Sequence, residues 1–250
     1  MNTQYKLVIA YDGTDYHGWQ VQPGLKTIAG VIQEKFKKVF NADIKLLAAS
    51  RTDAGVHALG QVARFESDLI ISPQKMLQGL RGKLPADIMI RSLEVVEDFN
   101  PRHDVNQKVY YYHFFSKQPL PFVARYGWYY RYPIDFEKLE KVLQLFVGTH
   151  DFRSYSTGYE RANTVRTIDQ VSVEYLKRYH MHRIVVKGSS FLHHMVRRMV
   201  GAALEVAASP HLAINYITDV MAQKNPQQTL PTAPAQGLLL YTVIYHKDKQ

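Results

Sequence analysis

The chain has 250 residues, of which 46% are hydrophobic and none is cysteine. Disulfide bonds, thiolate catalysis and cysteine-ligated zinc are therefore excluded, while the length allows one large domain or two small ones with a sizeable core. Lysine and arginine outnumber the acids by 31 to 22, a net charge of +9 that favours nucleic acid as partner over a membrane surface. Because no run of about 18 apolar residues occurs, we expect a soluble, cytoplasmic protein with no leader and no membrane span.

The first half of the chain shows six predicted elements. In chain order they are a strand at 5–11, a helix opened by Thr27, short strands at 43–50 and 60–66, a helix begun by Ser72 and Pro73, and a strand at 87–96. This is the order of the split βαβ, ferredoxin-like arrangement, whose helices cover one face of an antiparallel sheet. The other face stays available, and RNA-binding modules of this topology bind their ligand there.

The second half repeats the pattern with insertions. We expect strands at 108–116 and 126–132, a helix between Asp135 and Gly148, strands near 169–177 and 182–188, helices at about 190–208 and after Pro210, and a strand at 237–245. The predicted class is α+β, with two ferredoxin-like halves, 1–105 and 106–250, joined into one extended, mostly antiparallel sheet. Helices should lie on one side of this sheet and an RNA-binding cleft on the other.

The run SRTDAGVH at 50–57 places an arginine and an aspartate two positions apart. Aspartate and glycine are common turn residues, and Thr52 or Asp53 could simply cap a short helix. The chain has none of the usual sequence signatures for ATP, NAD, zinc-protease or serine-hydrolase sites. An aspartate that stays ionised in a cationic pocket can instead act as nucleophile or general base. Chemistry on a nucleotide is therefore the functional alternative to a plain turn.

Aromatic and basic residues mark two further stretches. In VYYYHFF at 109–115, alternation sends Tyr110 and Tyr112 to one face of a strand, where they suit either core packing or base stacking. Within a helix, the adjacent His193 and His194 would point about 100° apart, which excludes a zincin-type pair, and we expect no metal. Arg197 or Arg198 would be a functional residue only if its side chain pointed into a cleft and paired with a buried acid.

Several motifs, in one order, resemble the TruA-type tRNA pseudouridine synthases, which isomerise uridines at positions 38–40 of the anticodon arm. The matching stretches are YDGTDYHGWQ at 11–20, RTDAGVHALGQVARF at 51–65, KVYYY at 108–112, GTHDF at 148–152, RTI at 166–168, FLHHMVRRMVG at 191–201 and GLLL at 237–240. Ser50, Ala29 and the stretch around Arg81 and Gly82 depart from the family pattern at positions of backbone packing or of the RNA face rather than at the nucleophile.

The resemblance implies that Asp53 is the nucleophile and that Arg197 pairs with it. Tyr110 would stack on the flipped uracil and is a candidate to take the proton from C5, while Arg51 would steer the base or fill its vacated space. The implied substrate-binding residues are Tyr110, Arg51, His57, Arg166, His194 and Leu239. The implied partners are tRNA and a second copy of the chain in a homodimer, with no cofactor. A non-catalytic RNA-binding module and a metal-dependent nuclease are the alternatives, although the nuclease would need clustered carboxylates that the sequence does not display.

Overall fold

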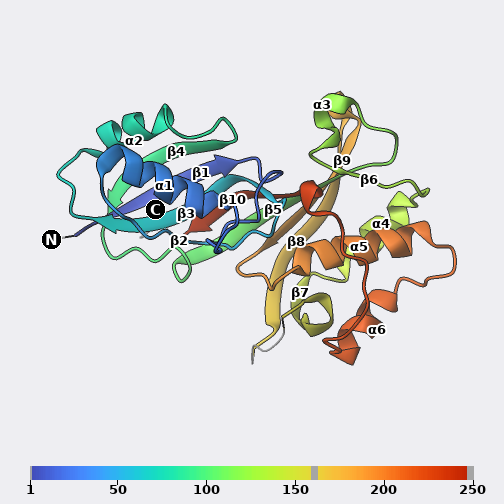
Figure 1. Ribbon diagram of the computed structural model, residues 1–250. Helices are drawn as coiled ribbons and strands as arrows, with labels where there is room; N and C mark the ends of the chain where they lie inside the picture. The colour runs from blue at the N-terminus through green and yellow to red at the C-terminus, as the bar shows by residue number, and fades with distance from the viewer. Residues whose placement is uncertain (1, 159–162, 247–250) are drawn as a thin grey trace. The chain divides into compact units, whose positions relative to one another are not determined.

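The computed structural model describes residues 2–158 and 163–246 (Figure 1). By its internal contacts the chain divides into two compact units. Unit 1 comprises Met1–Asn106 and Leu239–Gln250, and unit 2 comprises Gln107–Leu238. The domains 1–105 and 106–250 stay a proposal, to which this grouping adds that the residues from 239 onward lie with the first unit. No helix in the described ranges is long and apolar enough to cross a membrane.

Unit 1 follows the predicted order of strand, helix, strand, strand, helix, strand. Its elements are β1 (Thr3–Tyr11), α1 (Ile28–Phe40), β2 (Leu47–Ala48), β3 (His57–Ser67), α2 (Pro73–Arg81), β4 (Ile88–Val96) and, late in the chain, β10 (Leu238–Tyr245). β1 lies between β4 and β3 and is antiparallel to both. The short β2 pairs antiparallel with β3, whereas β10 pairs with β3 in parallel.

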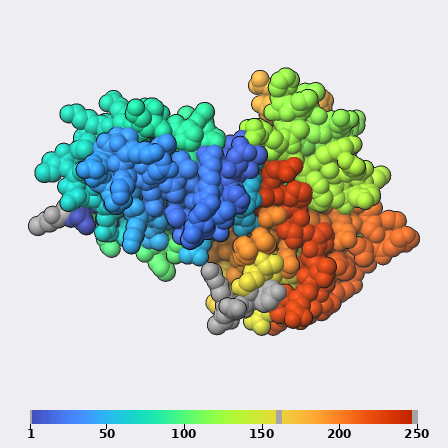
Figure 2. All heavy atoms as spheres, viewed as in Figure 1, coloured from blue at the N-terminus to red at the C-terminus, as the bar shows by residue number. Residues whose placement is uncertain are grey.

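The helices of unit 1 cover one face of its sheet. Tyr5 and Phe65 stack with ring centroids 5.0 Å apart, and Phe36 from α1 meets Phe65 edge-on at 5.3 Å. Figure 2 shows the side chains of α1 (blue) and α2 (cyan) spread over the face turned toward the viewer. As predicted, the Thr27 side chain caps α1 and the Ser72 side chain caps α2, because each accepts a hydrogen bond from a first-turn N–H group.

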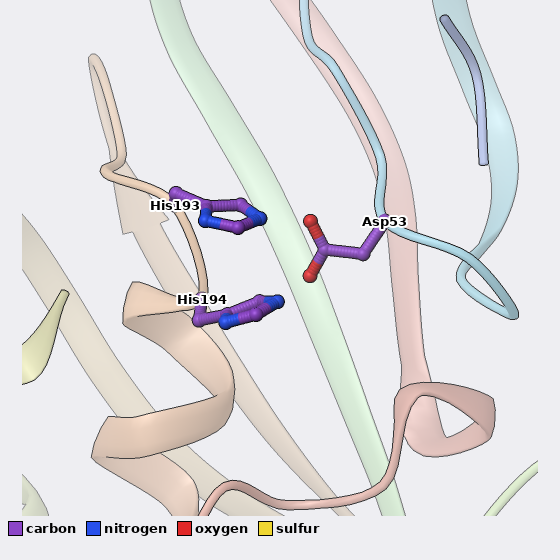
Figure 3. Close-up of side chains that lie close together, drawn as sticks. All are labelled: Asp53, His193 and His194. Carbon is purple, nitrogen blue, oxygen red and sulfur yellow. The ribbon is translucent and has the colours of Figure 1, made fainter. Parts of the chain in front are cut away.

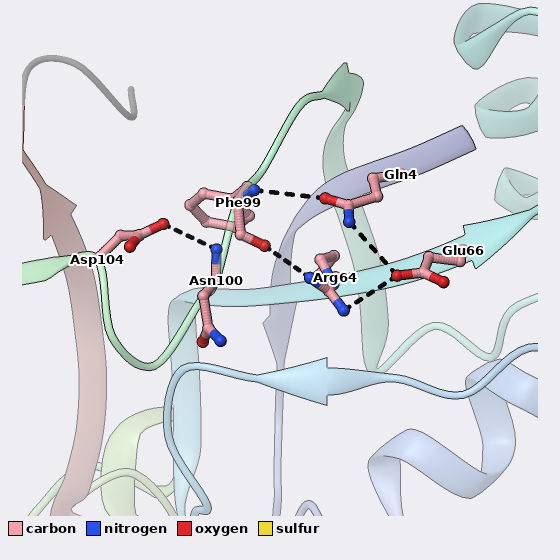
Figure 4. Close-up of polar contacts among 6 residues, drawn as sticks. All are labelled: Gln4, Arg64, Glu66, Phe99, Asn100 and Asp104. Atoms are coloured by element: carbon pink, nitrogen blue, oxygen red, sulfur yellow. Dashed lines mark hydrogen bonds and ion pairs between the residues drawn. The ribbon is translucent and has the colours of Figure 1, made fainter. Parts of the chain in front are cut away.

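Residues 97–104 cover part of the opposite face (Figure 4). Phe99 is buried, and the Lys6 ammonium lies 5.3 Å from the centre of its ring. The Phe99 N–H donates to the Gln4 side chain, and its carbonyl oxygen accepts from Arg64, which also pairs with Glu66 at 3.1 Å. These contacts attach the segment to β1 and β3.

Unit 2 also combines strands with helices. Its elements are β5 (Val105–Phe115), α3 (Pro121–Ala124), β6 (Trp128–Tyr129), α4 (Phe136–Gln144), β7 (Gly148–Asp151), β8 (Val165–Leu176), β9 (Met181–Gly188), α5 (Met195–Ala208) and α6 (Tyr216–Gln223). β5, β9, β8 and β7 are antiparallel neighbours in that order, and β6 pairs in parallel with β5. The described strands are thus mostly antiparallel and accompanied by helices, which confirms the predicted α+β class.

Unit 2 corrects three predicted boundaries. The strand expected at 126–132 is reduced to Trp128–Tyr129, and α4, capped by Asp135 as predicted, ends at Gln144 before Gly148 opens β7. The helix expected from about residue 190 begins only at Met195. The preceding His194 has φ 60°, a left-handed conformation that a right-handed helix cannot include.

Candidate active site

The loop that carries Asp53 is a tight turn in unit 1. The Val56 N–H donates to the Asp53 carbonyl oxygen at 3.2 Å, and Gly55 has φ 78°, a conformation that glycine adopts without steric cost. No helix begins within residues 50–57, all of which are described, so the expectation that Thr52 or Asp53 caps one is wrong. The half-buried Asp53 side chain extends away from the loop backbone (Figure 3).

Residues 11–20 hold this turn through backbone hydrogen bonds. The Trp19 N–H donates to the Thr52 carbonyl oxygen at 3.1 Å, and the Gly55 N–H donates to the Tyr16 carbonyl oxygen at 3.2 Å. The two motifs of the N-terminal half, 40 residues apart in the sequence, therefore form one structural feature.

Two glycines of the 11–20 segment make this close approach possible. A Cβ on Gly13 would lie 2.0 Å from the Val56 carbonyl oxygen, well inside van der Waals contact. A Cβ on Gly18 would lie 2.7 Å from the Thr52 carbonyl oxygen, and Gly18 also has φ 83°. These two glycines have no local sequence signal, because the atoms that they must avoid belong to a distant part of the chain.

His57 is buried where the loop enters β3. Its Nδ1 lies 3.1 Å from both the Gly13 backbone nitrogen and an Asp12 carboxylate oxygen. Leu239 of β10 is the register partner of His57 in the parallel pairing with β3. The ring therefore supports the 11–20 segment, and its predicted contact with substrate remains a proposal.

Tyr110 lies on β5 of unit 2, opposite Val186 of β9. Its ring is buried and meets Phe191 edge-on at 5.0 Å. Tyr112, also buried, donates its hydroxyl to the Pro234 carbonyl oxygen at 2.9 Å. Tyr111 between them is less buried, which is the alternation that a strand predicts.

The adjacent arginines of α5 have different neighbours. Arg198 donates to the Ser156 carbonyl oxygen at 2.9 Å, which ties the helix to the segment between β7 and β8. Arg197 donates through Nε to the Ala233 carbonyl oxygen at 2.8 Å. Burial raises the pKa of Tyr112 well above its usual value, and the positive charge of Arg197 opposes this rise. Arg197 thus acts electrostatically on Tyr112 of β5.

His193 and His194 stack in front of α5 (Figure 3), with ring centroids 3.8 Å apart and planes at 27°. The prediction that they point about 100° apart is wrong, because both residues precede the helix. The Thr157 hydroxyl lies 2.7 Å from Nδ1 of His193 and 2.9 Å from Nδ1 of His194. Because a hydroxyl has one hydrogen, it can donate to only one of the two rings and must accept from the other.

Arg51 and Arg166 complete the predicted set. Arg51 is exposed in the loop beside Asp53. Arg166 is partly buried on β8, opposite His150 of β7, and donates to the Val165 carbonyl oxygen at 2.6 Å. Unit 1 therefore carries Arg51, Asp53, His57 and Leu239, and unit 2 carries Tyr110, Arg166, His194 and Arg197.

Comparison with known proteins identifies the class. The sequence pattern of the family described as tRNA pseudouridine synthase matches residues 7–104 and 142–246. The chain therefore belongs to the tRNA pseudouridine synthase family, and it is an isomerase that acts on tRNA.

Individual relatives support the assignment over nearly the full length. The tRNA pseudouridine synthase A of Thermodesulfovibrio yellowstonii is 39% identical over 251 residues, covering 96% of this chain and 98% of the relative. The proteins of the same name from Pseudothermotoga lettingae and Aquifex aeolicus are 37% and 36% identical, each with the same two coverages.

Proposed function

We propose that the enzyme converts uridine to pseudouridine at positions 38, 39 and 40 of the tRNA anticodon stem-loop, with Asp53 as nucleophile and without cofactor or metal. The observation that carries the proposal is the turn that begins at Asp53. Backbone hydrogen bonds and close glycine contacts with residues 11–20 fix this turn, while the carboxylate extends from it. A nucleophilic side chain needs a rigid backbone of this kind, because small displacements of the reacting atoms slow a reaction strongly.

The reaction moves one glycosidic bond. The Asp53 carboxylate attacks C1′ of the ribose or C6 of the uracil, and the N1–C1′ bond breaks. The base turns so that C5 joins C1′, and the bond between Asp53 and the substrate then breaks, which restores the carboxylate. N1 gains a proton and C5 loses one, so the product is an isomer and no electrons are exchanged. Tyr110 stacks on the base, and its phenolic oxygen takes the C5 proton as the proton of the hydroxyl passes to solvent, from which N1 takes one. The Arg197 guanidinium keeps Asp53 ionised.

Substrate binding requires that the target base leave its stack, which costs a few kcal/mol. In the proposed assignment Arg51 steers the base or fills its vacated place. The further residues proposed to contact the RNA are His57, Arg166, His194 and Leu239. The net charge of +9 suits the phosphate backbone of tRNA. We place the enzyme in the cytoplasm, as a homodimer.

Replacement of Asp53 by asparagine tests the mechanism. The amide keeps the size of the carboxylate but cannot act as the nucleophile, so we expect Asp53→Asn to lower the single-turnover rate more than about 1,000-fold. The measurement is release of tritium from C5-labelled uridine in tRNA, since forming the C5–C1′ bond expels that hydrogen. Binding and melting should stay close to wild type.

Asp43→Asn is the matched control, because Asp43 is an exposed carboxylate of the same unit that pairs with Lys37. It should release tritium at the wild-type rate. Substantial release by folded Asp53→Asn would refute the nucleophile, and an inactive wild-type enzyme that still binds tRNA would favour the non-catalytic RNA-binding module. Mapping pseudouridines in tRNA from a strain without the gene tests the three positions.

A further inference from the structure

We infer that Tyr11 and Gln61 are positioning residues for Asp53, acting through one buried chain of hydrogen bonds that ends at Thr52. This inference rests on the proposed role of Asp53. Both residues lie in the quoted motifs, but the sequence assigns neither a role, because each is separated from its partners in the loop by ten or more positions.

Gln61 is a polar side chain in an apolar core. It is 0% exposed and lies on β3 opposite Ile9 of β1, on the face that the helices cover. Its amide bonds to both backbone groups of Ser50: Nε2 donates to the Ser50 carbonyl oxygen at 2.8 Å, and Oε1 accepts from the Ser50 N–H at 3.3 Å. The side chain therefore supplies the two bonds that a neighbouring strand would supply.

The same amide continues the chain toward the nucleophile. Nε2 of Gln61 also donates to the Tyr11 hydroxyl oxygen at 3.4 Å, and that hydroxyl lies 2.7 Å from Oγ1 of Thr52. An amide nitrogen can only donate, so the Tyr11 oxygen accepts from Gln61, and either hydroxyl can be the donor in the bond between Tyr11 and Thr52. Tyr11 is 4% and Thr52 7% exposed, so water does not readily replace these bonds.

These hydrogen bonds fix the loop at two residues that come shortly before Asp53. Gln61 holds Ser50, Tyr11 holds the Thr52 side chain, and the Trp19 N–H holds the Thr52 carbonyl oxygen. Buried hydrogen-bonded networks of this kind set one geometry, because each group left without its partner is costly. Hydrogen bonds that served only the stability of the fold would not need to lie beside Asp53.

Three substitutions separate positioning from stability. Thr52→Val and Tyr11→Phe each remove one end of the 2.7 Å hydrogen bond with little change of shape. We expect single-turnover tritium release to fall about 10- to 100-fold in each, with tRNA affinity within about twofold of wild type. Thr52→Ser restores the hydroxyl and should retain most of the rate. The double variant should be no slower than the slower single variant, since both changes remove the same bond.

Tyr245→Phe is the matched control. Its buried hydroxyl donates to the Pro101 carbonyl oxygen at 3.1 Å in the same unit, away from residues 50–57. It should melt at a reduced temperature like Tyr11→Phe but release tritium at the wild-type rate. If Thr52→Val does not fold, Tyr11→Phe with this control decides the question.

Amide hydrogen exchange of the peptide containing residues 50–57, measured without RNA, provides a readout independent of activity. Exchange should accelerate in Tyr11→Phe and Thr52→Val but not in Tyr245→Phe. Unchanged exchange overturns the inference whatever the chemistry proves to be. If Asp53→Asn is inactive while Thr52→Val and Tyr11→Phe react at the wild-type rate, the proposed function stands and the inference is overturned. If Asp53→Asn remains active, the nucleophile assignment fails, and with it the role of positioning Asp53 for attack.

Discussion

The two units support their candidate residues in different ways. In unit 1, Asp53 begins a turn whose shape depends on residues 11–20 and on buried side-chain hydrogen bonds. In unit 2, Tyr110 lies in the middle of a regular strand and Arg197 in the first turn of a helix. The turn needs particular neighbours, whereas strand register and helix geometry already orient the other two side chains. Substitutions that add atoms beside the turn should therefore lower the stability of unit 1. Substitutions of the candidate site residues in unit 2 should instead lower the activity of the enzyme and leave its fold intact.

The largest effect should come from crowding the turn. Gly13→Ala places a methyl group 2.0 Å from the Val56 carbonyl oxygen, so the backbone must shift. We expect a loss of about 3 kcal/mol in the free energy of unfolding, or roughly 6–12 °C in melting temperature. In Gly82→Ala, nothing lies within 4 Å of the added carbon, and stability should change by less than about 0.5 kcal/mol. Equal melting temperatures for the two variants would contradict the close-packing argument.

The next largest effect concerns the neighbouring arginines of α5, which should differ in what their replacement changes, the reaction rate or the stability. Arg197→Met should slow single-turnover tritium release about 100-fold, because the proposed partner charge of Asp53 is lost. Arg198→Met should instead cost about 2 kcal/mol of unfolding free energy, because it removes charged hydrogen bonds to backbone carbonyl groups. Single-turnover kinetics and thermal melting should be measured on both variants. Slower tritium release by Arg198→Met than by Arg197→Met would contradict the prediction.

A smaller effect distinguishes the two buried tyrosines of β5. Tyr110→Phe keeps the ring for stacking but removes the proposed proton acceptor, so the chemical step should slow about tenfold, or about 1.4 kcal/mol. Tyr112→Phe removes the hydrogen bond to Pro234 and should lower stability by about 1 kcal/mol without slowing the chemistry. Full single-turnover activity in Tyr110→Phe would reduce that residue to a stacking role.

The smallest expected effect concerns the pH dependence of unit 2. The His182 ring stacks with the rings of Phe114 and Phe136, with centroids 5.0 and 4.5 Å apart, and burial lowers the pKa of His182. The unfolded chain then binds the proton more readily. Stability present above the unfolded pKa of about 6.5 is therefore lost as the pH falls below it. Melting between about pH 7 and pH 5 should decline less steeply in His182→Gln than in wild type. The exposed His211→Gln serves as control, and parallel curves for all three proteins would exclude the effect.

The sequence predicted elements best where the signal is local. The caps at Thr27, Ser72 and Asp135 depend on a side chain and an N–H group three residues away, and all three form as expected. The start of α5 was misplaced because the left-handed conformation of His194 has no local signature. Among the candidate site residues, the resemblance supplied Asp53, whereas Tyr11 and Gln61 were missed. Their hydrogen-bond partners lie far along the chain and become visible only after folding.

The parallel pairing of β10 with β3 has a consequence for synthesis. Leu239 and Leu240 lie beside His57 and Ala58, although about 180 residues separate the two strands in the sequence. Domains generally fold as units while the chain leaves the ribosome, at about 5–20 residues per second. Residues 107–238 are contiguous in the sequence, so all strands and helices of unit 2 are present once residue 238 has emerged. Unit 1 is complete only when β10 has been synthesised. Until then, the residues of β3 next to the Asp53 loop lack their partner strand, for about 10–40 seconds of translation.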